Sequence, residues 1–322
     1  MELAMSAPGE ITRLARLAEP QVGEVTNVAP AHLQFFDSVD AIALAKRELI
    51  DYLATTGRDA VAILNEDDVR VRKFAEGFPG RVLTFGFSEK AIFRASGVKP
   101  GENIGSAFHV ASPDWEADFT LPLPGRHNIQ NAVAAIAAAS IYAIPPEEMR
   151  QALAGFQNLH QRSEILTLAD GVTIINDCYN SNPLAMERML EALADWPGAR
   201  RRIVVAGEML ELGPSSPELH RAVGRKCAQS GVKWAIGVQG AAQFLVEGAV
   251  EGGIPEPNAR FFPDAKSAGE FCLSVIAPGE VVLVKGSRGV HLETVIEMLK
   301  KQESGDRSQE SGIKNQNSRD RI

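Results

Sequence analysis

The sequence lacks the features of a membrane-bound or secreted protein. No apolar run among its 322 residues approaches the roughly 20 needed to cross a bilayer, and no basic stretch followed by an apolar one marks a secretion signal at the N-terminus. The three cysteines, Cys178, Cys227 and Cys272, are far apart and odd in number, which favours free thiols over a disulfide framework. Closely spaced cysteines or histidines, typical of structural zinc sites, are missing. We therefore expect a cytoplasmic protein without a membrane span.

Positive charge is also scarce. Lysine and arginine number 33 against 41 aspartates and glutamates, which gives a formal net charge of −8 and a pI near 5.4. A broad basic face is not expected from this balance, so the sequence argues against a nucleic-acid partner. A length of 322 residues with 45% hydrophobic side chains is enough for two domains, each with its own core.

The hydrophobic pattern predicts an α/β protein. In the first half, helices are expected at 11–18, 38–53, 128–143 and 146–156, and strands at 22–28, 60–64, 81–87, 107–111 and 119–123. In the second half, strands at 172–175, 203–206, 234–238 and 281–284 alternate with helices at 184–193, 217–230, 241–248, 267–275 and 292–300. Strands that alternate with helices indicate a parallel sheet.

The change of pattern predicts two domains, 1–158 and 159–302. Beyond residue 302 only Ile313 and Ile322 are aliphatic, and polar residues dominate. Such a segment buries too little apolar surface to fold, so we expect 303–322 to be a disordered tail.

Lys46 is the most informative single residue because it lies on the apolar stripe of its predicted helix. Ile42, Leu49, Ile50 and Leu53 occupy the same face. Burial lowers the pKa of a lysine, and a neutral amine can react with carbon dioxide to give a carbamate, an anion able to hold a metal. The alternative is a lysine at the edge of the stripe whose amine reaches solvent.

Other polar residues occupy positions where α/β proteins bind ligands. His32 and Asp177 follow predicted strands, and Asn128 and Asn131 share one face at the start of a helix. Lys285 precedes a basic turn that suits a phosphate or carboxylate. Structural alternatives remain for each: a core histidine, a capped helix start, a strand-to-helix turn and a solvated loop.

Several segments, in order along residues 2 to about 300, resemble motifs of the Mur ligase family. They are Glu2–Ile11, Thr26–Leu33, Ala45-Lys46, Gly125–Asn128 with Asn131, Asp177–Pro183, Gly207–Gly213 and Lys285–Arg288. The last three favour the member that adds D-alanyl-D-alanine to UDP-N-acetylmuramoyl-tripeptide in peptidoglycan synthesis. The resemblance implies a truncated central ATPase-type domain followed by a Rossmann-like C-terminal domain, and an ATP- and Mg²⁺-dependent peptide ligase with that tripeptide and dipeptide as substrates.

The resemblance also implies roles for individual residues. Lys46, carbamylated, and His32 would be catalytic, and these two with Glu2 would hold Mg²⁺. ATP would contact His127, Asn128, Asn131, Arg162 and Asp177. Substrate would contact Tyr179, Asn180, Asn182, Lys285 and Arg288. The chain departs from the family pattern at Ala4, Ala29 and Gln161, where glycine is usual, and at Glu208, where aspartate is usual.

The phosphate-binding loop of these ligases is missing from the sequence. That loop carries a Gly-Lys pair, and the chain contains no such dipeptide. The UDP-binding domain of the family is not matched either. We therefore expect a fragment that does not act alone and that is completed by further sequence or by a separately encoded N-terminal part. The alternatives are another Mur-type or folylpolyglutamate-type ligase, and a non-catalytic remnant or binding module.

Overall fold

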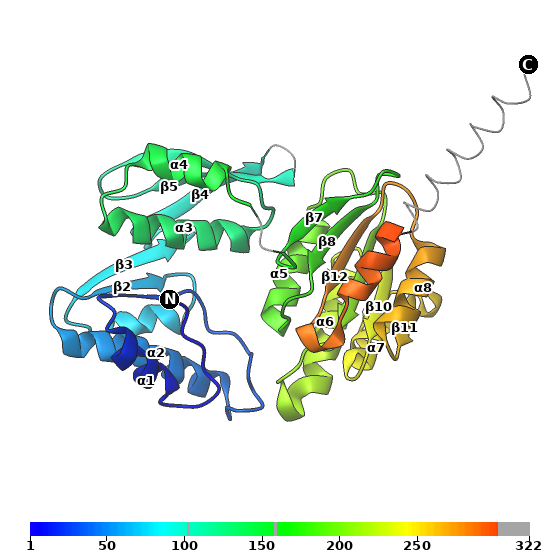
Figure 1. Ribbon diagram of the computed structural model, residues 1–322, viewed down its shortest axis with the longest axis horizontal. Coiled ribbons are helices and arrows are strands. Elements are labelled where there is room, and N and C mark those ends of the chain that lie inside the picture. The colour runs from blue at the N-terminus through cyan, green and yellow to red at the C-terminus, as the bar shows by residue number, and fades with distance from the viewer. Residues whose placement is uncertain (102–103, 158–159, 302–322) are drawn as a thin grey trace, which may run out of the picture. The chain divides into compact units, whose positions relative to one another are not determined.

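A computed structural model describes residues 1–101, 104–157 and 160–301 (Figure 1). The chain divides into two compact units. The first is Met1–Gln157 with the short segment Glu211–Gly213, and the second is the rest of the chain from Asn158 onward. The predicted tail 303–322 lies outside the described residues. Of the helices in the described residues, none combines the length and the apolar character that a membrane span requires.

The first unit is built on a mixed six-stranded sheet in the order β1-β2-β3-β4-β5-β6. The strands are β1 (Val22–Val25), β2 (Val61–Asn65), β3 (Arg81–Gly86), β4 (Phe93–Pro100), β5 (Ser106–Ala111) and β6 (Glu116–Leu121). Strands β1 to β4 run parallel, and β5 and β6 are antiparallel additions. The parallel half carries the carboxyl ends at which polar side chains gather.

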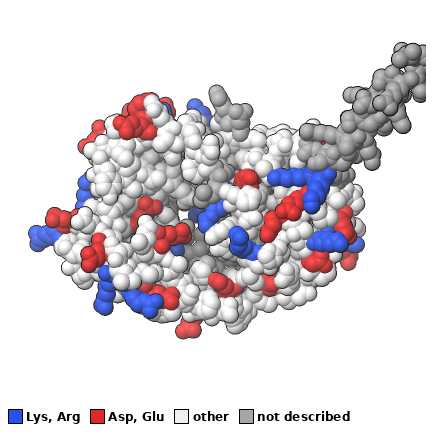
Figure 2. Space-filling model, viewed as in Figure 1, with Lys and Arg blue, Asp and Glu red and all other residues white. Residues whose placement is uncertain are grey.

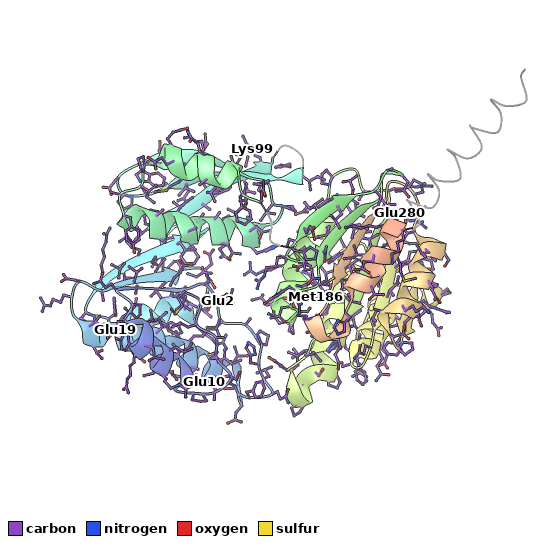
Figure 3. The ribbon with its side chains drawn as sticks, in the orientation of Figure 1. Glu2, Glu10, Glu19, Lys99, Met186 and Glu280 are labelled. Atoms are coloured by element: carbon purple, nitrogen blue, oxygen red, sulfur yellow. The ribbon has the colours of Figure 1, made fainter. Side chains whose placement is uncertain are left out.

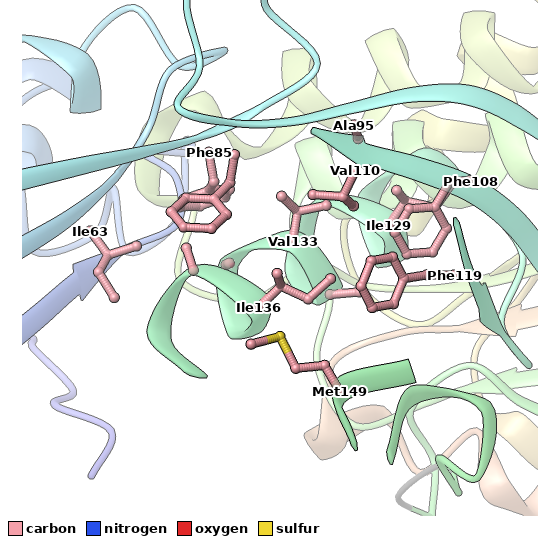
Figure 4. Packing of buried hydrophobic residues seen from close by; sticks show 14 of the residues in the cluster. Ile63, Phe85, Ala95, Phe108, Val110, Phe119, Ile129, Val133, Ile136 and Met149 are labelled. Carbon is pink, nitrogen blue, oxygen red and sulfur yellow. The ribbon is translucent and has the colours of Figure 1, made fainter. Parts of the chain in front are cut away.

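Helices cover both faces of this sheet. They are α1 (Glu10–Ala18), α2 (Val39–Thr56), α3 (Arg126–Ile141) and α4 (Pro146–Ala154), with a 3₁₀ turn η1 (Val71–Ala75). Because side chains alternate along a strand, Ala62 and Leu64 of β2 join the core under α2, whereas Val61 and Ile63 join the core under α3. The α3 core is rich in aromatic and branched side chains (Figure 4). Burial of both faces explains the continuous apolar run in β2.

The second unit is a mostly parallel sheet in the order β11-β10-β9-β12-β8-β7. Its strands are β7 (Glu164–Thr167), β8 (Thr173–Asp177), β9 (Arg202–Gly207), β10 (Trp234–Val238), β11 (Ala259–Phe262) and β12 (Val281–Lys285). Only β7 is antiparallel. Strand β12 returns from the end of the chain to lie between β8 and β9, so the carboxyl ends of these three strands are neighbours.

The helices of the second unit are α5 (Pro183–Ala194), α6 (Ser216–Gln229), α7 (Ala242–Glu251) and α8 (Ala265–Val275), with short 3₁₀ turns at Gly213–Ser215, Glu256–Asn258 and Arg288–Val290. Residues 293–301 are also helical. Helices α6 and α7 pack on each other. Helix α8 and residues 292–299 pack on the sheet in a common core.

The α/β class and the parallel sheets agree with the sequence prediction. Every predicted helix and strand is present within a few residues. Strand β1 ends at Val25 rather than at Val28, and β6 covers 116–121 rather than 119–123. The pattern missed β4, β7 and β11, which are interrupted by a bulge or only four residues long.

Candidate functional site

Lys46 lies half-buried on α2, at the position that the apolar stripe indicates. Its Nζ donates a hydrogen bond to the carbonyl oxygen of Asn27 at 2.8 Å. Burial lowers the pKa of the Lys46 amine, and the Asp68 carboxylate opposes this effect in part. A lysine with these surroundings has a larger neutral fraction than a solvated one, and the neutral amine is the form that reacts with carbon dioxide.

A cavity of about 760 Å³ opens beside Lys46. Its walls include Glu2, which is exposed and is labelled in Figure 3, and Glu24 on β1. Glu24 keeps access to solvent, yet the surrounding walls raise the pKa of its carboxyl through burial. The structure thus brings Glu2 and Lys46 to one cavity and adds Glu24, which the sequence analysis did not single out.

His32 lies elsewhere in the first unit and is not part of the described lining of that cavity. It adopts the left-handed backbone conformation with φ 61°. Its Nδ1 is 2.5 Å from Oε2 of Glu211, which belongs to the segment grouped with this unit. Glu2 and Lys46 therefore line one cavity, whereas His32 pairs with the carboxylate of Glu211.

The side chains beside Lys46 can be compared with the ligands that magnesium prefers. Among the described residues, no group of three or more His, Cys, Asp or Glu side chains is placed to hold a metal ion. Magnesium prefers oxygen ligands, and it commonly binds through one or two carboxylates together with substrate phosphates. Glu2 fits that chemistry, and carbamylation of Lys46 would add the oxygens that its amine lacks.

A polar network follows the carboxyl end of β2. The buried Asn65 donates from Nδ2 to the carbonyl of Thr26 at 2.7 Å and accepts the backbone N–H of Asp67 at Oδ1. Asp67 in turn accepts a hydrogen bond from Nε2 of Gln130 at 2.7 Å. Gln130 lies on α3, so this network links the segment after β1 to the helix that carries three of the predicted ATP contacts. The sequence analysis missed it, although the run Asn65 to Asp68 after an apolar strand is a signal of such a site.

Three of the predicted ATP contacts, His127, Asn128 and Asn131, lie in the first two turns of α3. His127 and Asn128 are half-buried, and Asn131 is exposed. Asn128 donates from Nδ2 to the carbonyl of Pro124 at 2.8 Å, so part of its function is structural. Next to it, the Arg126 guanidinium lies 3.8 Å from the centre of the Phe87 ring.

In the second unit, a buried ion pair joins the carboxyl ends of β8 and β12. Lys285, only 3% exposed, places Nζ 2.6 Å from Oδ2 of Asp177 and also donates to the carbonyl of Asn180 at 2.8 Å. The other oxygen of Asp177 accepts the backbone N–H of Ser163 at 3.0 Å. Both charges are thus largely satisfied within the protein, and the predicted ligand contacts Asp177 and Lys285 also hold the loop after β8.

An exposed aromatic and basic cluster surrounds Tyr179 on the same loop, with Arg162 from the segment before β7 and Arg288 from the turn after β12. The ring of Tyr179, 42% exposed, has the Arg162 guanidinium at 4.3 Å from its centre and the Arg288 guanidinium at 5.8 Å. Stacking on a ring restricts a guanidinium and leaves its N–H groups available for a carboxylate or phosphate. Arg162, Tyr179 and Arg288 therefore form a ready surface for an anionic ligand.

Three residues shape the backbone around this surface. Asn182 caps α5 by accepting the N–H of Ala185 at 2.9 Å. Gly286 permits a close approach of two strand ends, since a Cβ there would be 3.0 Å from the Cα of Gly207 and 2.8 Å from Leu292. Gln161 stands where the family has glycine, and its φ of 64° is the conformation that favours glycine.

The charge distribution is mixed rather than strongly basic. On the face in Figure 2, basic and acidic side chains are interspersed. This agrees with the acidic balance of the sequence.

Comparisons with known proteins identify both units. The family model for the Mur ligase middle domain matches residues 1–139, and the model for the Mur ligase glutamate ligase domain matches 161–288. The chain is similar to the UDP-N-acetylmuramoyl-tripeptide–D-alanyl-D-alanine ligases of Bacillus subtilis (29% identity, covering 93% of this chain and 63% of the relative) and Escherichia coli (31%, covering 95% and 65%). It therefore spans somewhat less than two thirds of the length of these relatives.

Solved structures agree with this result. MurF from Acinetobacter baumannii superposes with a TM-score of 0.83 at 27% identity, covering 94% of this chain and 64% of that one. MurF from Thermotoga maritima, in complex with ADP, gives 0.82 at 25% identity, covering 95% and 67%. The fold, the two domain matches and the order of the motifs lead to one conclusion: the chain belongs to the Mur ligase family.

Proposed function

We propose that this chain supplies the middle and C-terminal domains of an ATP-dependent peptide ligase that joins D-alanyl-D-alanine to UDP-N-acetylmuramoyl-tripeptide. The similar proteins of Bacillus subtilis and Escherichia coli carry the name of that activity. Since the chain spans about 63% to 65% of their length and contains no Gly-Lys dipeptide, we propose that it needs a further polypeptide part to act. The three unpaired, buried thiols support a cytoplasmic location.

The observation that carries the proposal is the environment of Lys46. Its amine is half-buried, its pKa is lowered by burial, and it shares a cavity with Glu2. An unmodified lysine there would face a metal ion with a cation, whereas a carbamate would face it with two oxygens. A carbamate at Lys46 would therefore explain how a site that binds divalent ions and phosphate can contain a lysine.

The second unit would contribute contacts to anionic ligands. Arg162 and Arg288, both exposed and both within 6 Å of the Tyr179 ring centre, present N–H groups in a planar geometry that suits carboxylates and phosphates. Lys285 is neutralised by Asp177, so its contribution is to hold the loop of Asn180 in place rather than to bring free charge to a ligand. We assign ligand binding to the two arginines and positioning to the buried pair.

Magnesium would enter with the phosphates of ATP. Glu2 and the Lys46 carbamate are the oxygen donors that the first unit offers to it. When bound, the ion neutralises charge on the phosphoryl group during transfer. His32 remains a candidate ligand through Nε2, since its Nδ1 is engaged by Glu211.

A ligation assay tests the proposal directly. The chain is combined with the part of the Bacillus subtilis relative that lies outside the matched residues, and phosphate release and peptide product are measured with ATP and the tripeptide substrate. We expect product with D-alanyl-D-alanine and loss of at least 100-fold in rate for Lys46→Ala. The control is Lys90→Ala, which removes an exposed lysine of the same unit and should leave the rate unchanged.

The same assay separates the alternatives. Product with glutamate or another single amino acid in place of the dipeptide would assign the chain to a different amide ligase of the family. Unchanged turnover of Lys46→Ala would remove Lys46 from the mechanism. No turnover with any acceptor, from a complex shown to be assembled, would make the chain a non-catalytic remnant.

A further inference from the structure

The carboxylate of Asp67 joins two elements of the first unit that lie far apart in the sequence. Its Oδ2 accepts the N–H of Phe87 at 2.8 Å and an N–H of the Gln130 side chain at 2.7 Å, and its Oδ1 accepts the N–H of Ser88 at 2.8 Å. Phe87 and Ser88 follow β3, whereas Gln130 lies on α3. One side chain after β2 therefore links the loop after β3 to the start of this helix.

Gly86 allows this loop to approach the carboxylate closely. Its φ of 149° lies in the region that other residues rarely adopt, and a Cβ there would be only 2.7 Å from the Asp67 carboxyl group. Both oxygens of Asp67 accept backbone N–H groups of the loop in addition to the donor of Gln130. Because the loop fixes the orientation of the carboxylate, the hydrogen bond from Gln130 fixes the helix relative to that loop.

The same loop contacts α3 a second time through Phe87. The guanidinium of Arg126, the first residue of α3, lies 3.8 Å from the centre of the Phe87 ring. Arg126 and Gln130 are separated by about one turn, so they lie on the same side of the helix. Two contacts one turn apart limit both the rotation and the sliding of the helix start against the loop after β3.

The core beneath α3 holds the helix in a different way. Ile129 and Val133 pack among apolar side chains (Figure 4). Such contacts select the inward face of the helix, but they are not directional. A hydrogen bond has a preferred distance and angle. The bond from Gln130 to Asp67 therefore sets the rotation of the first turns more narrowly than the apolar core alone.

We propose that Gln130, through its hydrogen bond to Asp67, is a positioning residue for the adenine nucleotide. The three ATP contacts on α3 that the family resemblance implies, His127, Asn128 and Asn131, occupy the same two turns of the helix. These three side chains are half-buried or exposed, whereas Gln130 is only 8% exposed. Gln130 therefore acts on the nucleotide through the helix and not by touching it. The inference rests on the proposed function, in which the chain binds ATP.

A purely structural role for this hydrogen bond has different consequences. If the bond only stabilises the first unit, its loss lowers the free energy of unfolding and leaves the affinity for nucleotide unchanged. If the bond sets the rotation of α3, its loss weakens nucleotide binding even in a fully folded variant, because the nucleotide contacts on the helix move together. The affinity of the folded chain for ADP therefore separates the two roles.

Calorimetric titration with ADP, the nucleotide in the similar Thermotoga maritima structure, measures this affinity. The full chain is titrated alone and in combination with the part of the Bacillus subtilis relative that lies outside the matched residues. Gln130→Met keeps the length of the side chain and removes its N–H groups, and we expect ADP to bind at least 10-fold more weakly. The control is Gln151→Met on the exposed surface of α4, where the amide donates to Glu147 at 3.2 Å, and its affinity for ADP should not change.

Gln130→Glu tests whether the hydrogen bond itself is the cause. Two carboxyl groups at hydrogen-bond distance share a proton, so the protonated form can donate to Asp67 as the amide does. We expect the ADP affinity of this variant to lie within about 3-fold of the wild-type value at pH 6 and to fall at least 10-fold below it at pH 8. If Gln130→Met does not fold, this comparison replaces it, since ionisation removes the donor without a second substitution.

Four results would overturn the inference: an ADP affinity of Gln130→Met within about 3-fold of wild type, an equal loss in Gln151→Met, an equal loss in Gln130→Glu at both pH values, or no ADP binding by the wild-type chain in either form. Because ADP binding needs no acceptor, this failure is distinct from that of the proposed function. Product formation with unchanged ADP affinity of Gln130→Met would reject the positioning role alone. ADP binding that depends on Gln130, without product from any acceptor, would reject the ligase and keep the positioning role.

Discussion

At the scale of single residues, His220 links the stability of the second unit to pH. The ring is fully buried, accepts the N–H of Met209 at Nε2 and donates from Nδ1 to the carbonyl of Ser216 at 2.7 Å. Burial lowers the pKa of His220, so the folded protein holds it neutral while the unfolded chain takes up a proton near pH 6.5. The stability it contributes is present above that pH and is lost as the pH falls below it. We expect the free energy of unfolding to drop from pH 7 to pH 5, by at most about 1.4 kcal/mol per pH unit from this group.

Urea unfolding at several pH values measures this effect. His220→Gln removes the titrating group, so its stability should be lower at pH 7 but should depend less on pH between 7 and 5. His291→Gln is the control, because that histidine is 71% exposed at the side chain and belongs to the same unit. An unchanged pH slope in His220→Gln would show that another group governs acid destabilisation.

At the scale of elements, Glu280 links the turn before β12 to Arg201, the residue that precedes β9. Its side chain is fully buried (labelled in Figure 3), pairs with Arg201 and accepts the N–H of Ala277 at 3.0 Å. Glu280→Ala leaves a cation without its partner, although Arg201 is 35% exposed and can reach water. We expect a loss of about 2–3 kcal/mol in unfolding free energy. Glu270→Ala, which removes a solvated i,i+4 pair with Lys266 on α8, should change little. If both variants lose the same unfolding free energy, the buried pair of Glu280 and Arg201 contributes no more to stability than the exposed pair.

The elements that the sequence predicted well are those with strong periodicity or continuous apolar runs. Strand β10 has the predicted bounds, and α2 begins after Ser38, whose side chain accepts the N–H of Ala41. Strand β4 was missed because a register shift between Ser96 and Lys99, with Gly97 at φ 58°, breaks the alternation. Strand β1 is shorter than predicted because the backbone beyond it bonds to side chains instead of to the β2 backbone. The carbonyl of Thr26 accepts a hydrogen bond from the Asn65 side chain, and the N–H of Val28 donates to Asp68.

The candidate site was predictable from sequence where a charged residue occupies an apolar position of its helix. Lys46 is such a residue: in the structure its side chain is half-buried, and burial lowers the pKa of its amine. The contact of Gln130 with Asp67 was not predictable, since it joins side chains 63 positions apart. The same holds for the stacking of Arg162 on Tyr179, whose geometry depends on the loop conformation at Gln161. Whether these residues act as the resemblance implies stays a prediction.

At the scale of the whole molecule, the two sheets differ in what lies beside their edge strands. The second sheet is bounded on one side by the antiparallel β7 and is covered by helices on its faces. In the first sheet, a cavity of about 760 Å³ lies beside the edge strand β1. Less apolar surface is removed from water around that cavity, so we expect the first unit to be the less stable one.

The cysteines allow the two units to be followed separately. Cys178, Cys227 and Cys272 all lie in the second unit, are buried, and have their thiol pKa raised to about 12 by burial. Thiolates are the reactive form, so a thiol reagent will label the chain only when the second unit opens. Trp115 reports on the first unit, although Trp196 and Trp234 add signal from the second.

We therefore expect urea to unfold the chain in two steps, with thiol labelling confined to the later one. Leu53→Ala, in the core of the first unit, should cost roughly 2–5 kcal/mol there and move the earlier transition to lower urea. The thiol-labelling curve should stay in place, because that core shares no residue with the second unit. Val282→Ala, in the core of the second sheet, is the complementary variant and should move the thiol-labelling curve to lower urea instead. If Leu53→Ala shifts both curves together, the chain unfolds as one cooperative body, and the lower stability expected from the cavity beside β1 belongs to the molecule as a whole.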